Sequence, residues 1–296
     1  MSSALPLRPR VESFFHQDTG TFTHVVYERP AAAAVIIDPV LDYDASTAVI
    51  STLSADAVLA FVGAHRLQVR WILETHAHAD HLSAAGYLHD VLGAPVGIGR
   101  GIIDVQARCR MLFGLGEAFV ADGRQFDRLL HDDDTLRVGE LDIRVIATPG
   151  HTDDSLTYLI GNAAFIGDTL FAPDIGTSRT DFPGGDARRL FASIRKILAL
   201  PADTRLFLCH DYPGSRRATM AECSIAAQAA DNIHIGGEVT EAAFVAMRQA
   251  RDATLATPRL ILPALQVNIR GGRLPVPDAD GVSYLRLPLN QLEGDV

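Results

Sequence analysis

One short segment decides how this sequence is interpreted, Thr75-His76-Ala77-His78-Ala79-Asp80-His81. An apolar run at 69–73 precedes it and is typical of a buried strand, whereas the residues from Leu82 onward are typical of a helix. We therefore predict that the segment forms the loop between the two. Side chains two residues apart in an extended segment project to the same side. His76 and His78 can thus converge on one point, and the turn into the helix can bring Asp80 and His81 to its other side.

The residue types in this loop indicate a metal site, because imidazole and carboxylate groups are ligands that zinc, iron and manganese accept. A solvated polar loop is the alternative. A chain of 296 residues with 11 histidines and 36 acidic residues contains H-x-H-x-[DE]-H by chance only on the order of once in a thousand cases. We therefore predict that these side chains bind metal.

The composition is that of a soluble globular protein, with 48% hydrophobic and 21% charged residues. The formal net charge of -10 argues against a nucleic-acid partner, although a local basic pocket for a small anion is compatible with it. The conspicuous apolar run at 31–37 is far too short to cross a membrane, and residues 1–10 lack the apolar core of a secretory signal. We expect a protein without membrane partners.

The cysteines favour a reducing compartment. Cys109, Cys209 and Cys223 are odd in number and show no CxxC spacing, which predicts a cytoplasmic protein without a disulfide framework. Cys209 lies beside His210 and could be a nucleophile, but the apolar residues at 206–208 favour buried packing for its thiol.

The hydrophobic pattern alternates between strands and helices, which indicates the α/β class. In the first half we predict strands at 21–27, 35–39, 69–73 and 96–98, and helices at 54–65, 82–92 and 102–113. In the second half we predict a hairpin at 136–141, strands at 143–147, 156–160, 163–166 and 205–208, and helices at 187–200 and 238–251.

Polar side chains recur where the predicted strands end. The strand at 143–147 leads to His151, the strand at 163–166 leads to Asp168, and the strand at 205–208 leads to His210. Open α/β sheets place their sites at the carboxyl ends of strands. We therefore expect these three residues to join the histidine loop in one site.

In this order, the motifs resemble those of the metallo-β-lactamase superfamily: His76-x-His78-x-Asp80-His81, Gly150-His151-Thr152, Gly167-Asp168-Thr169-Leu170 and His210-Asp211-Tyr212. The resemblance implies a four-layer αββα sandwich, with two sheets face to face, helices outside and the metal at one edge. It also implies one domain over 11–296, in which 213–296 is a C-terminal extension packed on the rest. A homodimer is a further expectation from the family.

Within the superfamily, the segments around the ligands are similar to those of persulfide dioxygenases, namely Thr148-Pro149-Gly150-His151-Thr152, Thr180-Asp181-Phe182-Pro183-Gly184-Gly185-Asp186 and Pro263-Ala264-Leu265-Gln266-Val267-Asn268. Such enzymes oxidise glutathione persulfide with O2 to sulfite and glutathione. The resemblance implies one Fe(II) per chain bound by His76, His151 and Asp168. It assigns the orientation of these ligands and the handling of protons to four neighbours, His78, Asp80, His81 and His210.

Hydroxyacylglutathione hydrolases of the glyoxalase II type are the alternative, with two Zn or mixed Zn/Fe ions that cleave a glutathione thioester. One metal would be bound by His76, His78 and His151, the other by Asp80, His81 and His210, and Asp168 would bridge them. The same ligands serve both interpretations, and the flanking motifs and short tail favour the dioxygenase. A non-catalytic family member is disfavoured by the complete ligand set, and β-lactam hydrolysis by the missing secretory signal.

A glutathione substrate carries carboxylates that need cationic or hydrogen-bonding partners. We predict that three residues contribute to its pocket: Arg179, Tyr212 and Arg270. Asp153 and Asp154 depart from the family pattern, and we expect Asp154 to narrow or charge the pocket near the metal.

Overall fold

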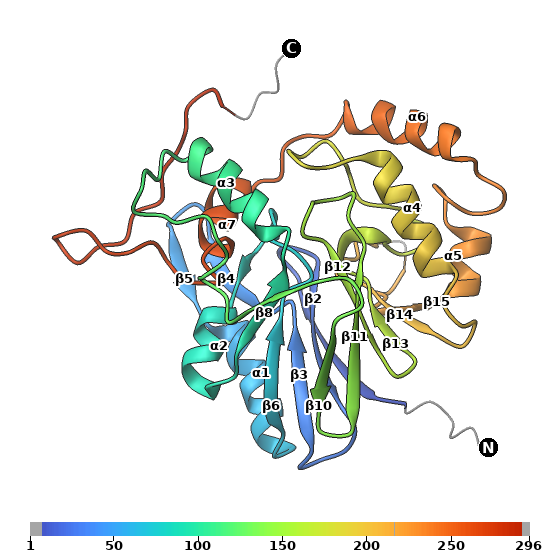
Figure 1. Cartoon of the computed structure of the whole chain (residues 1–296), viewed down its shortest axis with the longest axis horizontal. Helices are drawn as coiled ribbons and strands as arrows, with labels where there is room; N and C mark the ends of the chain where they lie inside the picture. The colour runs from blue at the N-terminus through green and yellow to red at the C-terminus, as the bar shows by residue number, and fades with distance from the viewer. Residues whose placement is uncertain (1–7, 216, 292–296) are drawn as a thin grey trace.

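Two six-stranded β-sheets lie face to face in the computed structural model, which describes residues 8–215 and 217–291 (Figure 1). The first sheet has the order β1 (Arg10–His16), β2 (Thr21–Tyr27), β3 (Ala33–Ile37), β6 (Gln68–Leu73), β8 (Val96–Gly99) and β9 (Arg128–Leu130). The second has the order β10 (Thr135–Val138), β11 (Leu141–Ala147), β12 (Leu156–Ile160), β13 (Ala163–Phe165), β14 (Arg205–Phe207) and β15 (Glu222–Ser224). A small third sheet joins β5 (Val49–Ser51), β4 (Val40–Asp44) and β7 (Leu82–Ser83).

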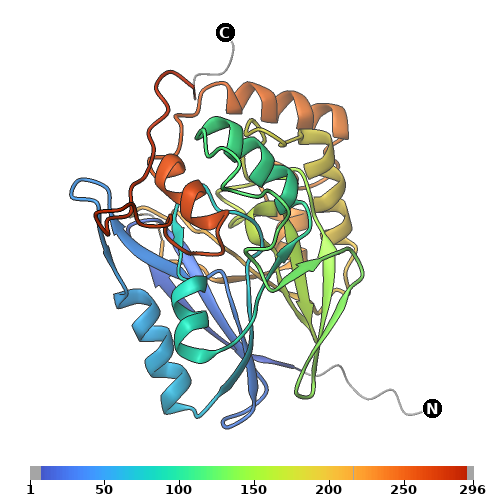
Figure 2. The same ribbon diagram turned by 60° about the vertical axis from the view of Figure 1, so that its left-hand side comes forward.

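Helices cover the outer face of each sheet, as Figures 1 and 2 show from two directions. The apolar cluster outside the first sheet includes residues of α1 (Leu53–Ala64), α2 (Ala85–Leu92), α3 (Ile102–Leu112) and α7 (Ile261–Asn268). The cluster outside the second sheet includes residues of α4 (Ala187–Leu198), α5 (Ile225–Asp231) and α6 (Glu241–Asp252). Each sheet therefore has two apolar faces. One packs against the other sheet, and the second packs against helices.

A third apolar cluster fills the space between the sheets. Ile37 and Leu73 from the first sheet pack there with Ile143, Tyr158 and Phe165 from the second, and all five are at most 1% exposed. Burial of this many apolar side chains is the main contribution that holds two sheets together. The four-layer αββα sandwich expected from the sequence is confirmed.

Strand direction explains why the site lies at one edge. Strands β3, β6 and β8 are parallel neighbours in the first sheet. In the second sheet β13 and β14 are parallel, and β11 points the same way because two antiparallel pairings separate it from β13. The carboxyl ends of β6, β11, β13 and β14 each precede one polar motif of the sequence analysis. The expected convergence of strand ends is therefore present.

The structure corrects three of the predicted elements. The helix predicted at 82–92 begins only at Ala85, because Leu82 and Ser83 pair with Leu41 and Val40 as strand β7. The helix predicted at 238–251 is α6, Glu241–Asp252, and the Thr240 side chain caps it by accepting from the Ala243 amide. The described residues from 213 to 291 contain three helices, where the sequence predicted one.

Candidate metal centre

Buried polar side chains fix the shape of the histidine loop between β6 and β7. Asp38 accepts hydrogen bonds from the Thr75 amide (2.7 Å) and the Thr75 hydroxyl (2.9 Å). Asp154 accepts from the Ala77 amide at 2.8 Å. The Asn268 side chain in α7 donates to the carbonyls of His78 and His81, both at 2.8 Å. Hydrogen bonds within the protein thus anchor the loop backbone at both ends.

The second sheet also holds this loop. The Tyr158 hydroxyl donates to the Glu74 carbonyl at 2.7 Å, and the Leu156 amide donates to the Thr75 carbonyl at 2.8 Å. Strand β12 therefore ties the loop to the motifs that follow β11 and β13.

His76, His151 and Asp168 form one compact group, whose ligand atoms all lie within 4.8 Å of one another. Oδ2 of Asp168 lies 3.9 Å from Nε2 of His76 and 3.6 Å from Nε2 of His151. Nδ1 of His151 is 2.8 Å from the Arg179 carbonyl oxygen, which can act only as a hydrogen-bond acceptor. This hydrogen bond fixes the tautomer and leaves the Nε2 lone pair of His151 directed at Asp168.

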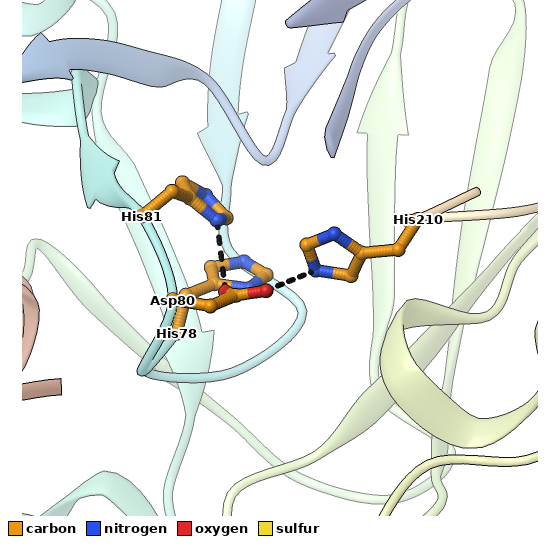
Figure 3. A group of neighbouring side chains, drawn as sticks. All are labelled: His78, Asp80, His81 and His210. Atoms are coloured by element: carbon orange, nitrogen blue, oxygen red, sulfur yellow. Dashed lines mark hydrogen bonds and ion pairs between the residues drawn. The ribbon is translucent and has the colours of Figure 1, made fainter. Parts of the chain in front are cut away.

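His78, Asp80, His81 and His210 form a second compact group (Figure 3). The Asp80 carboxylate lies between two imidazoles, with Oδ2 3.2 Å from Nε2 of His210 and Oδ1 3.3 Å from Nδ1 of His81. Nε2 of His210 is also 3.4 Å from Oδ1 of Asp168, so Asp168 links this group to the first.

Several buried atoms of the two groups have no hydrogen-bond partner among the described residues, namely Nδ1 of His78, Nε2 of His81, Nε2 of His210 and Oδ1 of Asp168. A buried polar atom without a partner is costly, and native proteins rarely keep one without a reason. Imidazole nitrogen and carboxylate oxygen together are a donor set for Zn or Fe. The residues therefore fit a metal centre.

The protonation state of two of the histidines also suits metal binding. Burial, with the neighbouring imidazoles, lowers the pKa of His76 and of His78 well below the usual value, so both rings are neutral. Burial opposes ionisation of Asp80, yet His210 and His81 hold the pKa of its carboxyl far below its usual range. Burial also disfavours the charged form of His210, but Asp168 and Asp80 outweigh it and raise its pKa.

Two carboxylates behind His78 escaped the sequence analysis. Nε2 of His78 lies 3.0 Å from Oδ1 of Asp38 and 3.6 Å from Oε2 of Glu74. Carboxylates that hold the far nitrogen of a ligating histidine are typical of metal sites. The only local sign of a role for Asp38 was its place near the end of the strand predicted at 35–39. Its contact with His78 spans 40 positions of sequence.

A cavity of about 280 Å³ opens over the two groups and is lined by Asp80, His151 and Asp168 together with Arg179, Phe182, Tyr212 and Arg251. The Tyr212 ring stacks on the His210 ring, with centroids 5.7 Å apart. The Arg179 guanidinium donates to both carboxylate oxygens of Asp181, each at 2.6 Å. Arg251 has no carboxylate partner among the described residues, and the sequence analysis did not single it out.

Cys209 is 2% exposed, and its thiol lies 3.7 Å from Oδ2 of Asp38. Burial, with the nearby carboxylates, raises the pKa of this thiol well above the usual value, so it is a poor nucleophile. The buried packing predicted for Cys209 is confirmed.

The sequence model of the metallo-beta-lactamase superfamily matches residues 18–210 of the chain. These residues include every member of the two groups. This chain belongs to the metallo-beta-lactamase superfamily. No described helix is long and apolar enough to cross a membrane.

Superfamily relatives carry different functional names. A protein of Burkholderia pseudomallei named a probable metallo-hydrolase is 50% identical over 292 residues, covering 95% of this chain and 99% of the relative. The human mitochondrial persulfide dioxygenase ETHE1 is 31% identical over 215 residues, covering 72% of each chain. The crystal structure of ETHE1 from Myxococcus xanthus has a TM-score of 0.70 and 29% identity, covering 89% of this chain and 100% of its own. These relatives establish the superfamily and leave dioxygenase and hydrolase as the two alternatives.

The remaining predicted residues fall in different places of this superfamily fold. Arg179 and Tyr212 line the cavity over the metal groups, whereas Arg270 lines a separate cavity that shares no residue with it. Asp154 points into the protein toward the Ala77 amide, and Asp153 forms ion pairs with Arg108 and Arg189 at 2.5 and 2.6 Å. Neither aspartate lines the cavity over the metal groups, so the expectation that Asp154 narrows this pocket is wrong.

Proposed function

We propose that the protein is an Fe(II)-dependent persulfide dioxygenase. The reaction is glutathione persulfide plus O2 plus water, giving glutathione, sulfite and two protons. The observation that carries the proposal is the compact group of His76, His151 and Asp168 below one open cavity. Two imidazoles and a carboxylate on one side of a site form the triad typical of non-haem Fe(II) oxygenases.

An Fe(II) ion at this triad would supply open coordination positions and would mediate the transfer of four electrons from the outer persulfide sulfur to O2. The chain's own part is to orient the three ligands. The Arg179 carbonyl holds His151 through Nδ1, and the Thr75 hydroxyl lies 3.1 Å from Nδ1 of His76. Both rings can therefore present Nε2 to the site.

Proton handling would fall to the second group. Nε2 of His210 sits 3.2 Å from Oδ2 of Asp80 and 3.4 Å from Oδ1 of Asp168, so a proton held at this atom has a carboxylate on either side. In this proposal His210 holds one of the two protons that the reaction releases, and Asp80 stabilises the imidazolium.

Glutathione persulfide would enter through the cavity over the triad. Tyr212 can offer its phenol as a hydrogen-bond donor at one side. At the rim, Arg251 offers an unpaired guanidinium for a carboxylate of the tripeptide, while the charge of Arg179 is largely neutralised by Asp181. We therefore assign Arg251 ahead of Arg179 as the main cationic contact of the substrate.

A binuclear thioester hydrolase is the second candidate, favoured by the unpartnered Nδ1 of His78 and Nε2 of His81. In that alternative Asp38 and Glu74 would orient His78 toward a metal, Asp168 would be a ligand of both ions, and the ions would supply an activated water. The 50% identical relative named a metallo-hydrolase also supports it.

The three free thiols support the expected cytoplasmic location, since disulfides persist mainly in oxidising compartments. The homodimer expected from the family stays a prediction.

The test is to purify the protein anaerobically, load it with Fe(II), and follow O2 uptake with glutathione persulfide. We expect one O2 consumed and one sulfite formed per persulfide, and a KM raised about ten-fold by Arg251→Met, with Arg195→Met on the exposed face of α4 as the control. Release of glutathione from S-lactoylglutathione without O2 uptake would replace the proposal with the hydrolase.

A further inference from the structure

Arg270 lines a cavity that the proposed function does not use. Several cationic side chains surround this cavity. Its volume is about 620 Å³, within the range of ligand sites for molecules of nucleotide size. Its lining includes four arginines, Arg124, Arg270, Arg273 and Arg286, and one aspartate, Asp278. In a chain of net charge -10, such a concentration of positive charge is unusual.

Two of the four arginines have their charge neutralised. Arg124 pairs with Asp122 at 2.6 Å, and Arg273 pairs with Asp90 at 2.7 Å. Arg270 and Arg286 differ, because neither has a carboxylate within 4.0 Å among the described residues. Both line the same cavity, and burial lowers the pKa of Arg270.

A buried glutamine fixes both arginines at this site. Gln266 in α7 is 1% exposed, and its side chain accepts from the Arg286 amide at 2.8 Å and donates to the Arg286 carbonyl at 3.0 Å. The Gln266 backbone carbonyl accepts a hydrogen bond from Arg270. Figure 2 shows the C-terminal segment in dark red alongside α7.

The two guanidinium groups are partly preorganised. The Arg270 guanidinium stacks over the Phe119 ring, 4.9 Å from its centroid, and Arg286 donates to the carbonyls of Phe113 and Gly114 after α3. Each group keeps N–H donors that these contacts do not use, because a guanidinium has five. Fixed guanidinium groups without carboxylate partners that line one cavity can bind phosphate or carboxylate in two-point contacts.

We propose that this arginine cavity binds a small organic polyanion of about nucleotide size, with a phosphate or carboxylate group held between Arg270 and Arg286. Gln125 and Tyr284, which also line the cavity, would contact the rest of the ligand. The site is separate from the metal groups and does not depend on the proposed reaction. An anion there would tie the C-terminal segment to α7 and to the end of α3, since Arg286, Arg270 and Phe113 belong to these three parts.

The test is isothermal titration of the whole protein with ADP, citrate and inorganic phosphate, each to 10 mM at low ionic strength. We expect saturable 1:1 binding of ADP if the ligand is an organic phosphate, or of citrate if it is a polycarboxylate, with inorganic phosphate weaker. Arg270→Met and Arg286→Met should each weaken binding at least ten-fold, and Arg195→Met on α4 should leave it unchanged. Thermal denaturation of each variant without ligand checks that it is folded.

Three results would overturn the proposal. One is that none of the three anions binds. Another is that Arg195→Met weakens binding as much as Arg270→Met, which would mean a general ionic effect. The last is that binding survives Arg270→Met and Arg286→Met but is lost in His76→Ala, which would mean that the anion binds at the metal groups.

Discussion

Removal of the Asp252 carboxylate should show how strongly the C-terminal region supports the site. Asp252 in α6 is 5% exposed and accepts from Nε and Nη2 of Arg248 at 2.9 and 2.7 Å. It also accepts from the Thr180 amide and hydroxyl at 2.9 and 3.0 Å. Asp252→Ala leaves the Arg248 guanidinium, which is 1% exposed, as a buried charge without its partner.

The expected loss is about 3 to 5 kcal/mol of the free energy of unfolding, the usual cost of breaking a buried ion pair. For a chain of 296 residues the melting temperature should fall by about 5 to 8 °C. Urea denaturation followed by circular dichroism measures the first quantity, and calorimetry measures the second.

The same helix offers a matched control. Glu241 at the start of α6 pairs with Arg188 at 3.3 Å, and both side chains are largely exposed. Glu241→Ala should therefore cost only about 0 to 1 kcal/mol. Equal losses for the two variants, or a loss below about 1 kcal/mol for Asp252→Ala, would refute the reasoning. The double variant Arg248→Met, Asp252→Leu should recover part of the stability, because it removes both charges but leaves the Thr180 amide and hydroxyl without their acceptor.

Three further predictions follow from single buried groups. Burial lowers the pKa of His24 to about 4 in the folded protein, against 6.5 in an unfolded chain, so the unfolded state binds more protons between these pH values. The free energy of unfolding should therefore fall by about 3 kcal/mol as the pH drops from 6.5 to 4. In urea titrations, His24→Gln should reduce this dependence on pH. Burial raises the pKa of the Cys109 thiol to about 12 and of the Cys223 thiol to about 11. Ellman's reagent at pH 8 should therefore label the native protein slowly, and it should label all three thiols after denaturation. Rapid labelling of one thiol in the native protein would contradict this. Asn268→Ala removes the hydrogen bonds to the histidine loop and should weaken metal binding about ten-fold, as measured by chelator competition, whereas the exposed Gln249→Ala should have no effect.

The sequence predicts the parts of the site that local pattern encodes. His76, His151, Asp168 and His210 each follow a strand whose apolar residues are visible in the sequence, and the strands bring them to one edge. The resemblance to the superfamily supplied the sandwich, because face-to-face packing of two sheets has no local signal.

What the sequence misses depends on contacts between distant segments. Asn268 contacts the His78 carbonyl across 190 positions, and Asp38 contacts the His78 ring across 40. Strand β7 was missed for the same reason, since Leu82 becomes a strand residue only through its pairing with Leu41. Arg270 was chosen for its charge, but α7 directs it into a different cavity from that of the metal groups.

The central claim is that a single iron is bound by His76, His151 and Asp168, while His78 only supports them. The most direct measurement is the iron content of wild type, His76→Ala and His78→Ala after identical anaerobic loading and desalting. We predict about one iron per chain in the wild type, almost none in His76→Ala, and most of the iron retained in His78→Ala. Two metal ions in the wild type, with equal loss in both variants, would contradict the claim and favour the binuclear hydrolase.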